Sequence, residues 1–352
     1  MQREAEDLRH LSRSLKNALV TGGTDGVGKE VARGLAHAGH RVIVVGRDVE
    51  KGVRAERELR EATGNRGVLF LRADLSLARE ACRLGDEVAG RWPALHYLVH
   101  CAGIVRGRRE LTGGGLESNF AVNYLSRFVL TTQLIPLLAA AGRAGEASRI
   151  VHVSGAAQGG AIYFDDVNLT TNFNTVRAVR QFCRANDLFI IELARRLAEA
   201  GYGRYVTVTC LKLGVVKTNI RREFPWWMRW LVPLALDPLL ALTPQEAAEP
   251  VLKLLLGAEF EGTTGALFTK IRTFRRLTPA AGVLDPEEGH ALWELSEQLA
   301  VDRQSCRNLD EADNNRVGGG PVVARPTSGG QLRPLKRERS FVRAGRTLSP
   351  IR

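Results

Sequence analysis

A glycine-rich turn near the N-terminus carries the clearest chemistry in the chain. It follows the apolar run at 17–20 and reads Thr21-Gly22-Gly23-Thr24-Asp25-Gly26-Val27-Gly28. Gly22 permits a tight strand-to-helix turn, Gly26 permits close approach of a pyrophosphate, and Gly28 lets the helix pack near the strand. The helix that begins here would point its N–H groups and positive dipole end at the phosphates. The turn therefore predicts a dinucleotide site, with contacts from Thr21, Gly22, Thr24, Asp25, Gly26, Val27 and Gly28.

The tip of the second predicted strand bears on which dinucleotide is bound. An acidic residue there would accept hydrogen bonds from the ribose hydroxyls and favour NAD(H). Gly46 occupies that place and Arg47 follows it, and a guanidinium can pair with a 2′-phosphate. The neighbouring Asp48 weakens this argument. We therefore expect NADP(H) in preference to NAD(H), with NAD(H) as the alternative.

Alternating strands and helices must position these residues. Apolar runs predict strands at 17–20, 41–45, 68–71, 97–102, 148–153, 206–211 and 266–269. Amphipathic stretches predict helices at 26–38, 50–63, 78–91, 116–140, 184–199, 244–256 and 286–300. The alternation predicts an α/β fold, a doubly wound parallel sheet of the Rossmann type in a single domain. We expect this domain to span 15–303, after an N-terminal extension at 1–14 and before a flexible basic tail at 304–352.

Composition limits the classes of partner and site. The net charge is +12, and the segment from Val317 onward supplies +7 of it with eight basic residues and one acidic residue. We interpret this Gly-, Pro- and Ser-rich tail as a solvated extension and expect no nucleic-acid binding, because no fold signal supports it. The five cysteines form no C-x-x-C pair, so we expect neither a metal site nor a disulfide framework. Together with an N-terminus that lacks a signal peptide, this predicts a cytoplasmic location.

The segment Phe224–Leu242 is the most apolar candidate for a membrane contact. It contains Trp226, Trp227 and Trp230 but is interrupted by charges and prolines, and no run of 18 apolar residues predicts a membrane span. We interpret the segment as a mobile lid over an apolar pocket. The alternatives are peripheral membrane contact through Trp226–Trp230 and an ordinary packed helix.

The spacing Thr-Gly-x-x-x-Gly-x-Gly resembles the short-chain dehydrogenase/reductase family, and further motifs extend the resemblance over about residues 15–300. Asp74 and Leu75 stand where the family contacts adenine, and Ala102 and Gly103 stand in its Asn-Asn-Ala-Gly motif, whose two asparagines are His100 and Cys101 here. The resemblance implies Asn123 as the catalytic Asn and Thr218 as a residue that reaches the nicotinamide carboxamide.

The branch that the chain resembles is the retinol-dehydrogenase-like group, through residues 44–52 and the helix at 192–197. This resemblance implies an oxidoreductase that interconverts a small apolar carbonyl and its alcohol. It also implies a homodimer through the long helices near 116–140 and 184–199.

The family's acid–base pair is missing from this chain. The resemblance calls for a Ser at the end of the fifth strand and a Tyr-x-x-x-Lys on the following helix, with Tyr as the general acid/base and Lys as its activator. None of the five tyrosines is followed four residues later by Lys or Arg. The resemblance places Val179 at the Tyr position and Cys183 at the Lys position. The Ser aligns with Gly155, whereas a slip of one residue would make Ser154 the catalytic Ser.

Two hypotheses follow. The chain is an NADP(H)-dependent oxidoreductase with an unrecognised proton donor, such as Tyr163, Ser154 or a water. Alternatively, it is a dinucleotide-binding pseudoenzyme that acts as a sensor or a scaffold.

Overall fold

Strand β1 (Asn17–Thr21) lies in the middle of a twisted sheet in the computed structural model, which describes residues 15–217, 241–279 and 285–300. Within these ranges the sheet has eight strands in the order β3-β2-β1-β4-β5-β6-β7-β8. The strands beyond β1 are β2 (Arg41–Gly46), β3 (Val68–Arg72), β4 (Tyr97–His100), β5 (Ser148–Gly155), β6 (Val206–Leu213), β7 (Ala266–Lys270) and β8 (Phe274–Leu277). The strand order reverses between β1 and β4, which is the place where this class of sheet binds nucleotides.

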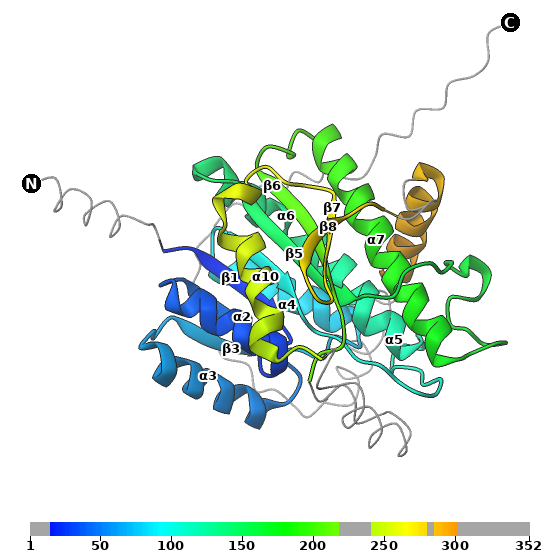
Figure 1. Cartoon of the computed structure of the whole chain (residues 1–352), viewed down its shortest axis with the longest axis horizontal. Helices are drawn as coiled ribbons and strands as arrows, with labels where there is room; N and C mark the ends of the chain where they lie inside the picture. Colours follow the sequence, from blue (N-terminus) through cyan, green and yellow to red (C-terminus); the bar gives the residue numbers. More distant parts are fainter. Residues whose placement is uncertain (1–14, 218–240, 280–284, 301–352) are drawn as a thin grey trace, which may run out of the picture. The chain divides into compact units, whose positions relative to one another are not determined.

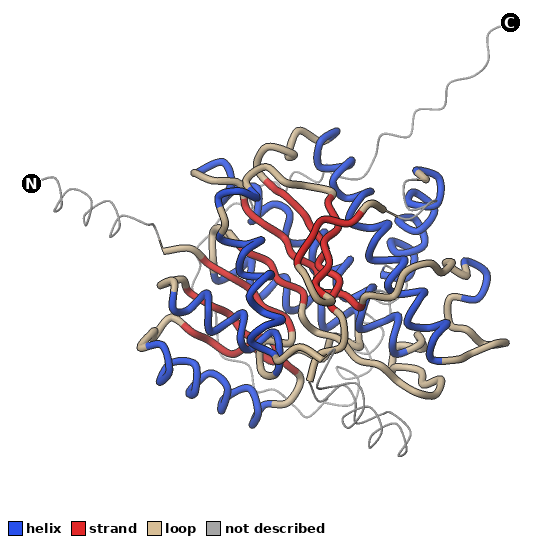
Figure 2. Tube along the Cα trace, viewed as in Figure 1, coloured by secondary structure: helices blue, strands red, loops and turns tan. Residues whose placement is uncertain are grey.

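Helices cover both faces of the sheet (Figures 1 and 2). One face carries α2 (Gly26–His37), α3 (Val49–Thr63) and α10 (Pro244–Leu256). The other carries α4 (Ala78–Arg91), α6 (Ser126–Ala144), α7 (Thr175–Glu199) and the helix at 286–300. Short elements complete the described chain: α5 (Ser118–Phe120), η1 (Ala121–Leu125), η2 (Phe164–Asp166) and η5 (Ala258–Phe260). The doubly wound α/β fold is therefore confirmed.

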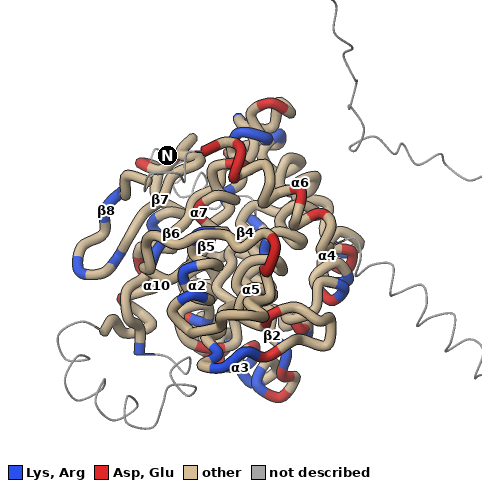
Figure 3. Tube along the Cα trace, turned by 90° about the vertical axis from the view of Figure 1, so that its right-hand side faces the viewer, with Lys and Arg blue, Asp and Glu red and all other residues tan. Residues whose placement is uncertain are grey.

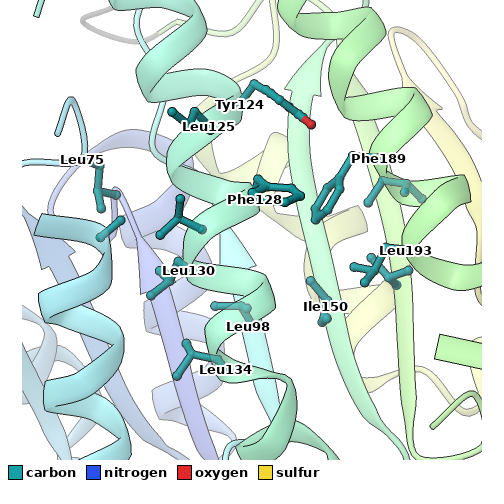
Figure 4. Close-up of a cluster of buried hydrophobic side chains, with 14 of the residues drawn as sticks. Leu75, Leu98, Tyr124, Leu125, Phe128, Leu130, Leu134, Ile150, Phe189 and Leu193 are labelled. Atoms are coloured by element: carbon teal, nitrogen blue, oxygen red, sulfur yellow. The ribbon is translucent and has the colours of Figure 1, made fainter. Parts of the chain in front are cut away.

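The larger hydrophobic core lies between the sheet and the α4, α6 and α7 layer (Figure 4). Phe128 and Phe189 face each other from α6 and α7 with ring centroids 5.5 Å apart. Trp293 closes this aromatic group at 5.0 Å from Phe128. Each such buried ring stabilises the fold by about 1.5–3 kcal/mol, so this cluster fixes α7 against the sheet.

Side-chain caps determine where several helices begin. Asp25 accepts a hydrogen bond from the N–H of Gly26 at the start of α2, and Asp48 accepts one from Lys51 at the start of α3. Asn174 caps α7 by accepting from the N–H of Arg177. Because Asn174 lies well before residue 184, α7 is nine residues longer than the sequence predicts.

Two further elements differ from expectation. The predicted helix at 116–140 is divided into α5, the π-helical segment η1 and α6. Strand β8 is absent from the sequence prediction and pairs antiparallel to β7, so the sheet is mostly rather than wholly parallel. Arg275 and Arg276 on β8 are exposed. Figure 3 shows β8 at the edge of the sheet, with Lys and Arg positions along it.

One described helical stretch, Ser118–Ala144, is long and apolar enough to cross a membrane by length and composition. The sequence prediction named Phe224–Leu242 as the nearest such segment instead. In the structure 67% of the most apolar window of Ser118–Ala144 is buried, which is typical of a core helix. All the described residues belong to one compact unit, and Asp310–Arg352 lies outside the described residues.

Candidate functional site

The glycine-rich turn connects β1 to α2 and leaves no room for a side chain at Gly22 or Gly28. Gly22 and Gly26 have φ angles of 67° and 51°, a region that favours glycine. A Cβ on Gly22 would lie 2.7 Å from the backbone nitrogen of Ala102, and one on Gly28 would lie 2.3 Å from the carbonyl oxygen of Gly22. The turn therefore needs glycine for its own packing, and it presents the N-terminus of α2 beside the switch point of the sheet.

The other predicted residues of the turn hold it against β4. Thr21 is fully buried, and its Oγ1 accepts a hydrogen bond from the N–H of Ala102 at 3.3 Å. Thr24 lies over Gly46, where a Cβ would approach the Thr24 hydroxyl to 2.8 Å. Val27 packs against the smaller core cluster on the α2 side. The structure thus brings the turn, the tip of β2 and the end of β4 together, as a bound dinucleotide requires.

Two cations stand beside this turn at the tip of β2. Arg47 is exposed and has no ion-pair partner among the described residues. Asp48 is engaged in capping α3, where its carboxylate accepts from the N–H of Lys51 at 2.9 Å. The Lys51 ammonium pairs with Asp25 of the turn. The carboxylate of Asp48 therefore serves as a helix cap, and Arg47 is the exposed cation at the strand tip that has no ion-pair partner among the described residues.

The predicted adenine and ribose contacts also lie at the carboxyl edge of the sheet. Asp74 follows β3, and its Oδ1 accepts from the N–H of Ser76 at 3.0 Å. Leu75 is buried in the larger core. Gly103 follows β4, and a Cβ there would lie 2.9 Å from Oδ1 of Asn123. Contact of each of these residues with a cofactor stays a prediction.

Asn123 lies in the π-helical segment η1, a helical irregularity that often occurs at functional sites. Its side chain donates to the carbonyl oxygens of Ile104 and Asn119, at 2.8 Å each. Its backbone carbonyl accepts a hydrogen bond from Nδ2 of Asn186 on α7 at 2.9 Å. Asn123 therefore joins the loop after β4 to α7, and its amide is held in one orientation.

Ser154, at the end of β5, faces α7 rather than open space. Its Oγ lies 3.7 Å from Sγ of Cys183, and that sulfur lies 3.5 Å from the carbonyl oxygen of Gly155. Cys183 is 1% exposed, and burial raises the pKa of its thiol. A Cβ on Gly155 would make only an ordinary contact with this sulfur, at 3.4 Å. Val179, one turn earlier on α7, is half-buried against the core.

Two buried cations lie near Cys183. The side chain of Arg127 is 3% exposed and crosses from the end of β4 to the end of β5. Lys212 on β6 is 2% exposed and pairs with Asp187, which lies one turn after Cys183 on α7. We define the carboxyl ends of β4 and β5, with the side chains that meet there, as the reaction end of the site.

The tyrosines offer few alternatives as proton donors. Tyr97, Tyr202 and Tyr205 lie at the amino ends of strands, away from the reaction end. Tyr124 is fully buried and its hydroxyl pairs with Ser296 at 2.7 Å. Tyr163, which follows β5, is the one tyrosine on the carboxyl side with partial exposure, and the guanidinium of Arg177 lies 3.9 Å from its ring centroid.

Several predicted features lie outside the described residues: Thr218, the Trp226–Trp230 cluster and most of the expected lid at 224–242. Conversely, the sequence interpretation missed Lys51, Arg127 and Lys212. An available signal for Arg127 was its four-residue spacing after Asn123 within the predicted helix at 116–140, which places the two side chains on one helix face. Lys51 had no comparable signal, because Arg47 precedes the start of α3. Lys212 stands out as a lone charge in the apolar strand β6.

Comparisons with known proteins agree with this arrangement. The sequence pattern of the family described as short chain dehydrogenase matches residues 16–163. Human retinol dehydrogenase 13 is 32% identical over 289 residues, which cover 81% of this chain and 84% of that protein. Human polyprenol dehydrogenase is 33% identical over 249 residues, which cover 70% of this chain and 74% of that protein.

Solved structures share the fold. An uncharacterized protein from Mycobacterium paratuberculosis superposes with a TM-score of 0.63 at 26% identity, covering 81% of this chain and 93% of that chain. RhlG of Pseudomonas aeruginosa, solved in a complex with NADP, superposes with a TM-score of 0.58 at 24% identity. That match covers 74% of this chain and 96% of RhlG, and it concerns the fold alone.

Proposed function

Because this chain belongs to the short-chain dehydrogenase/reductase family and is similar to retinol dehydrogenases, we propose that it binds NADP(H) at a site whose acid–base machinery is weakened. The family consists of NAD(P)-dependent oxidoreductases. The observation that carries the proposal is the contact between Ser154 and Cys183, because the resemblance assigns to Cys183 the position of the family's Lys and a neutral thiol there supplies no ammonium. In this proposal the protein acts as a dinucleotide-binding sensor or scaffold.

The geometry of the turn supports retention of cofactor binding. The backbone of Gly22 and Gly26 adopts the conformations that a phosphate-binding turn needs, and α2 directs its N–H groups to the same place. Arg47 is exposed at the tip of β2 without an ion-pair partner among the described residues, so its guanidinium is available to a 2′-phosphate. Asp48 caps α3, and the ammonium of Lys51 is paired with Asp25. These features favour NADP(H) over NAD(H).

Weakened chemistry follows from the residues on α7. Val179 has no proton to exchange, and the raised pKa of Cys183 keeps its thiol neutral at physiological pH. General acid–base catalysis contributes about 10²–10⁴-fold to a rate, so loss of both groups removes most of the turnover. Ser154 remains able to hydrogen-bond a carbonyl oxygen, but its hydroxyl has no activated proton relay beside it.

A second candidate function is an active reductase or dehydrogenase for an apolar carbonyl or alcohol. The names of the human relatives, retinol dehydrogenase 13 and polyprenol dehydrogenase, favour this substrate class. Tyr163 would be the proton donor in this case, because it follows β5, is partly exposed, and has the guanidinium of Arg177 3.9 Å from its ring centroid.

Titration calorimetry with NADPH and NADH, followed by turnover assays, separates the two functions. We expect NADPH to bind more tightly than NADH and the rate with all-trans-retinal or a panel of apolar aldehydes and ketones to stay at background. Turnover clearly above background, lost on Tyr163→Phe, would establish the second function in place of the first. Absence of binding by either nucleotide would refute both.

Restoring the missing groups gives a sharper test. The triple variant Gly155→Ser, Val179→Tyr, Cys183→Lys should gain carbonyl reduction, since Gly155 has space for a side chain. A matched variant with Val179→Phe in place of Val179→Tyr supplies the same ring without the proton, and it should stay inactive. Equal activity of the two variants would show that the residue at 179 is not the missing acid.

The location and partners also remain proposals. We retain the cytoplasm as the predicted location and a homodimer as the predicted assembly. Membrane contact through Trp226–Trp230 is a further prediction, and these residues lie outside the described ranges.

A further inference from the structure

The guanidinium of Arg127 lies beneath the reaction end and is bound there by neutral groups. Nη2 donates to the carbonyl oxygen of Ala102 at 2.8 Å, and Nη1 donates to that of Val153 at 2.8 Å and to Oδ1 of Asn186 at 3.3 Å. Its side chain is 3% exposed. Arg127 therefore joins β4, β5 and α7 through a charge that is removed from water.

No negative charge balances this cation in the described part of the chain. None of the ion pairs there includes Arg127, and its Nε has no hydrogen-bond partner. The neighbouring buried carboxylate, Asp187, is already paired with Lys212. Burial of an unpaired charge costs folding free energy, so the buried guanidinium of Arg127 calls for a functional reason.

The neighbouring titratable side chains do not change this balance. His100 and His152 lie side by side below Arg127, and burial together with the guanidinium lowers the pKa of His152 to about 3. Burial first, then the neighbouring His152 and the guanidinium of Arg127, lower the pKa of His100. Burial raises the pKa of the Cys183 thiol. The two imidazoles and the thiol are therefore neutral at pH 7, and the net charge of this group of four side chains is the single positive charge of Arg127.

The position of Arg127 relates this charge to one half of the cofactor. A dinucleotide with its pyrophosphate on the Gly22–Gly28 turn would have its adenosine toward Arg47, which follows β2, so its nicotinamide half would extend toward β4 and β5. Arg127 binds the carbonyl of Ala102 at the end of β4, and a Cβ on Gly103 would lie 4.0 Å from its Nη2. The charge therefore lies at the nicotinamide end.

We infer that Arg127 makes this site select the reduced dinucleotide over the oxidised one. The two forms share every group except the ring, which carries a positive charge when oxidised and none when reduced. A buried cation that neutral groups surround repels the first ring and not the second, and low-dielectric surroundings strengthen that repulsion. The inference rests on the proposed function, and it specifies the state to which a dinucleotide sensor would respond.

Binding constants of the full chain test this without any variant. Calorimetric titrations would use NADPH, NADP⁺ and 2′-phospho-ADP-ribose, which lacks the nicotinamide. We expect NADPH to bind at least about tenfold more tightly than NADP⁺, and NADP⁺ to bind no more tightly than the ligand without a ring. Equal dissociation constants for NADPH and NADP⁺ would overturn the inference and leave the proposed function standing. Failure of all three ligands to bind would refute the proposed function and the inference with it.

Variants then assign the selectivity to its residue. Arg127→Gln removes the charge and keeps an amide donor, so the ratio of the two dissociation constants should fall to within about twofold of one. Arg127→Lys keeps the charge and should keep most of the ratio. Arg47→Gln is the matched control at the adenosine end, and it should weaken both forms equally. Thermal unfolding shows whether each variant is folded, and an unchanged ratio in folded Arg127→Gln would refute the assignment.

Discussion

Replacing Lys212 by Met should destabilise the protein strongly, and more at neutral than at acidic pH. Lys212 and Asp187 are 2% and 7% exposed, and their ion pair joins β6 to α7 one turn beyond Cys183. Oδ1 of Asp187 has no hydrogen-bond partner, so the ammonium is the main stabiliser of this carboxylate. The other nearby cation, Arg184, is engaged with Glu288. Removal of Lys212 therefore leaves the buried carboxylate of Asp187 without a counter-charge.

The expected loss of folding stability is limited by protonation of the Asp187 carboxylate. Breaking a buried pair from one side typically costs about 3–5 kcal/mol. The unpaired carboxylate of Asp187 can instead take up a proton. Protonation costs about 1.4 kcal/mol for each pH unit above the pKa of about 3.9 that an aspartate has in the unfolded chain. The penalty can thus reach about 5 kcal/mol at pH 7.5 but only about 1.5 kcal/mol at pH 5.0.

The sign of the pH dependence follows from Asp187. Burial already raises its pKa, and loss of Lys212 removes the charge that opposes this shift. A carboxyl whose pKa is raised in the folded state loses stability as the pH rises above its unfolded value. The Lys212→Met variant should therefore be closest to the wild type near pH 5 and furthest from it above pH 7.

Urea unfolding, followed by circular dichroism at pH 5.0 and 7.5, measures both effects. Arg57→Met is the matched control, because Arg57 and Glu61 are each 70% exposed and such pairs contribute about 0–1 kcal/mol. The double variant Lys212→Met, Asp187→Asn should recover most of the loss at pH 7.5. A loss below about 1 kcal/mol at pH 7.5, or one of equal size at both pH values, would refute the reasoning.

Three other perturbations follow from the site. Gly28→Val should abolish NADPH binding, because even a Cβ would lie 2.3 Å from the carbonyl oxygen of Gly22, and calorimetry of folded protein that still bound NADPH would contradict this. Asn186→Leu removes the donor to the carbonyl of Asn123 and should lower the free energy of unfolding by about 2 kcal/mol; an unchanged urea midpoint would count against it. Arg47→Glu should weaken NADPH binding at least about tenfold and NADH binding by less than twofold, and equal losses would show that Arg47 does not bind a 2′-phosphate.

Local pattern predicts much of this fold because the apolar strands are buried on both sides. Strands such as β1 and β2 read as continuous hydrophobic runs, and helices such as α4 and α10 begin and end within a residue or so of their amphipathic stretches. The start of α7 was missed because its cap, Asn174, precedes a turn of mixed polarity that has no clear helical period. Strand β8 was missed because Phe274–Leu277 is short and half charged, and its pairing with β7 stabilises it.

The site could be predicted less fully than the fold. The glycine turn depends on local sterics, so residues 21–28 alone indicate it. The reaction end depends on contacts between distant segments, such as Ser154 with Cys183 and Lys212 with Asp187. The π-helical turn at Asn123 has no local sequence signal either. It depends on Asn186 of α7, which donates a hydrogen bond to the backbone carbonyl of Asn123.

The charged edge strand β8 also has a consequence for solubility. Its outer side leaves backbone donors and acceptors unpaired within the described part of the chain, and such an edge can recruit a strand from another molecule. Arg275 and Arg276 place two exposed guanidinium groups along that edge, so two copies approaching edge to edge would bring like charges together. The short strand that ends the sheet therefore disfavours edge-to-edge pairing with a second copy at this end of the sheet.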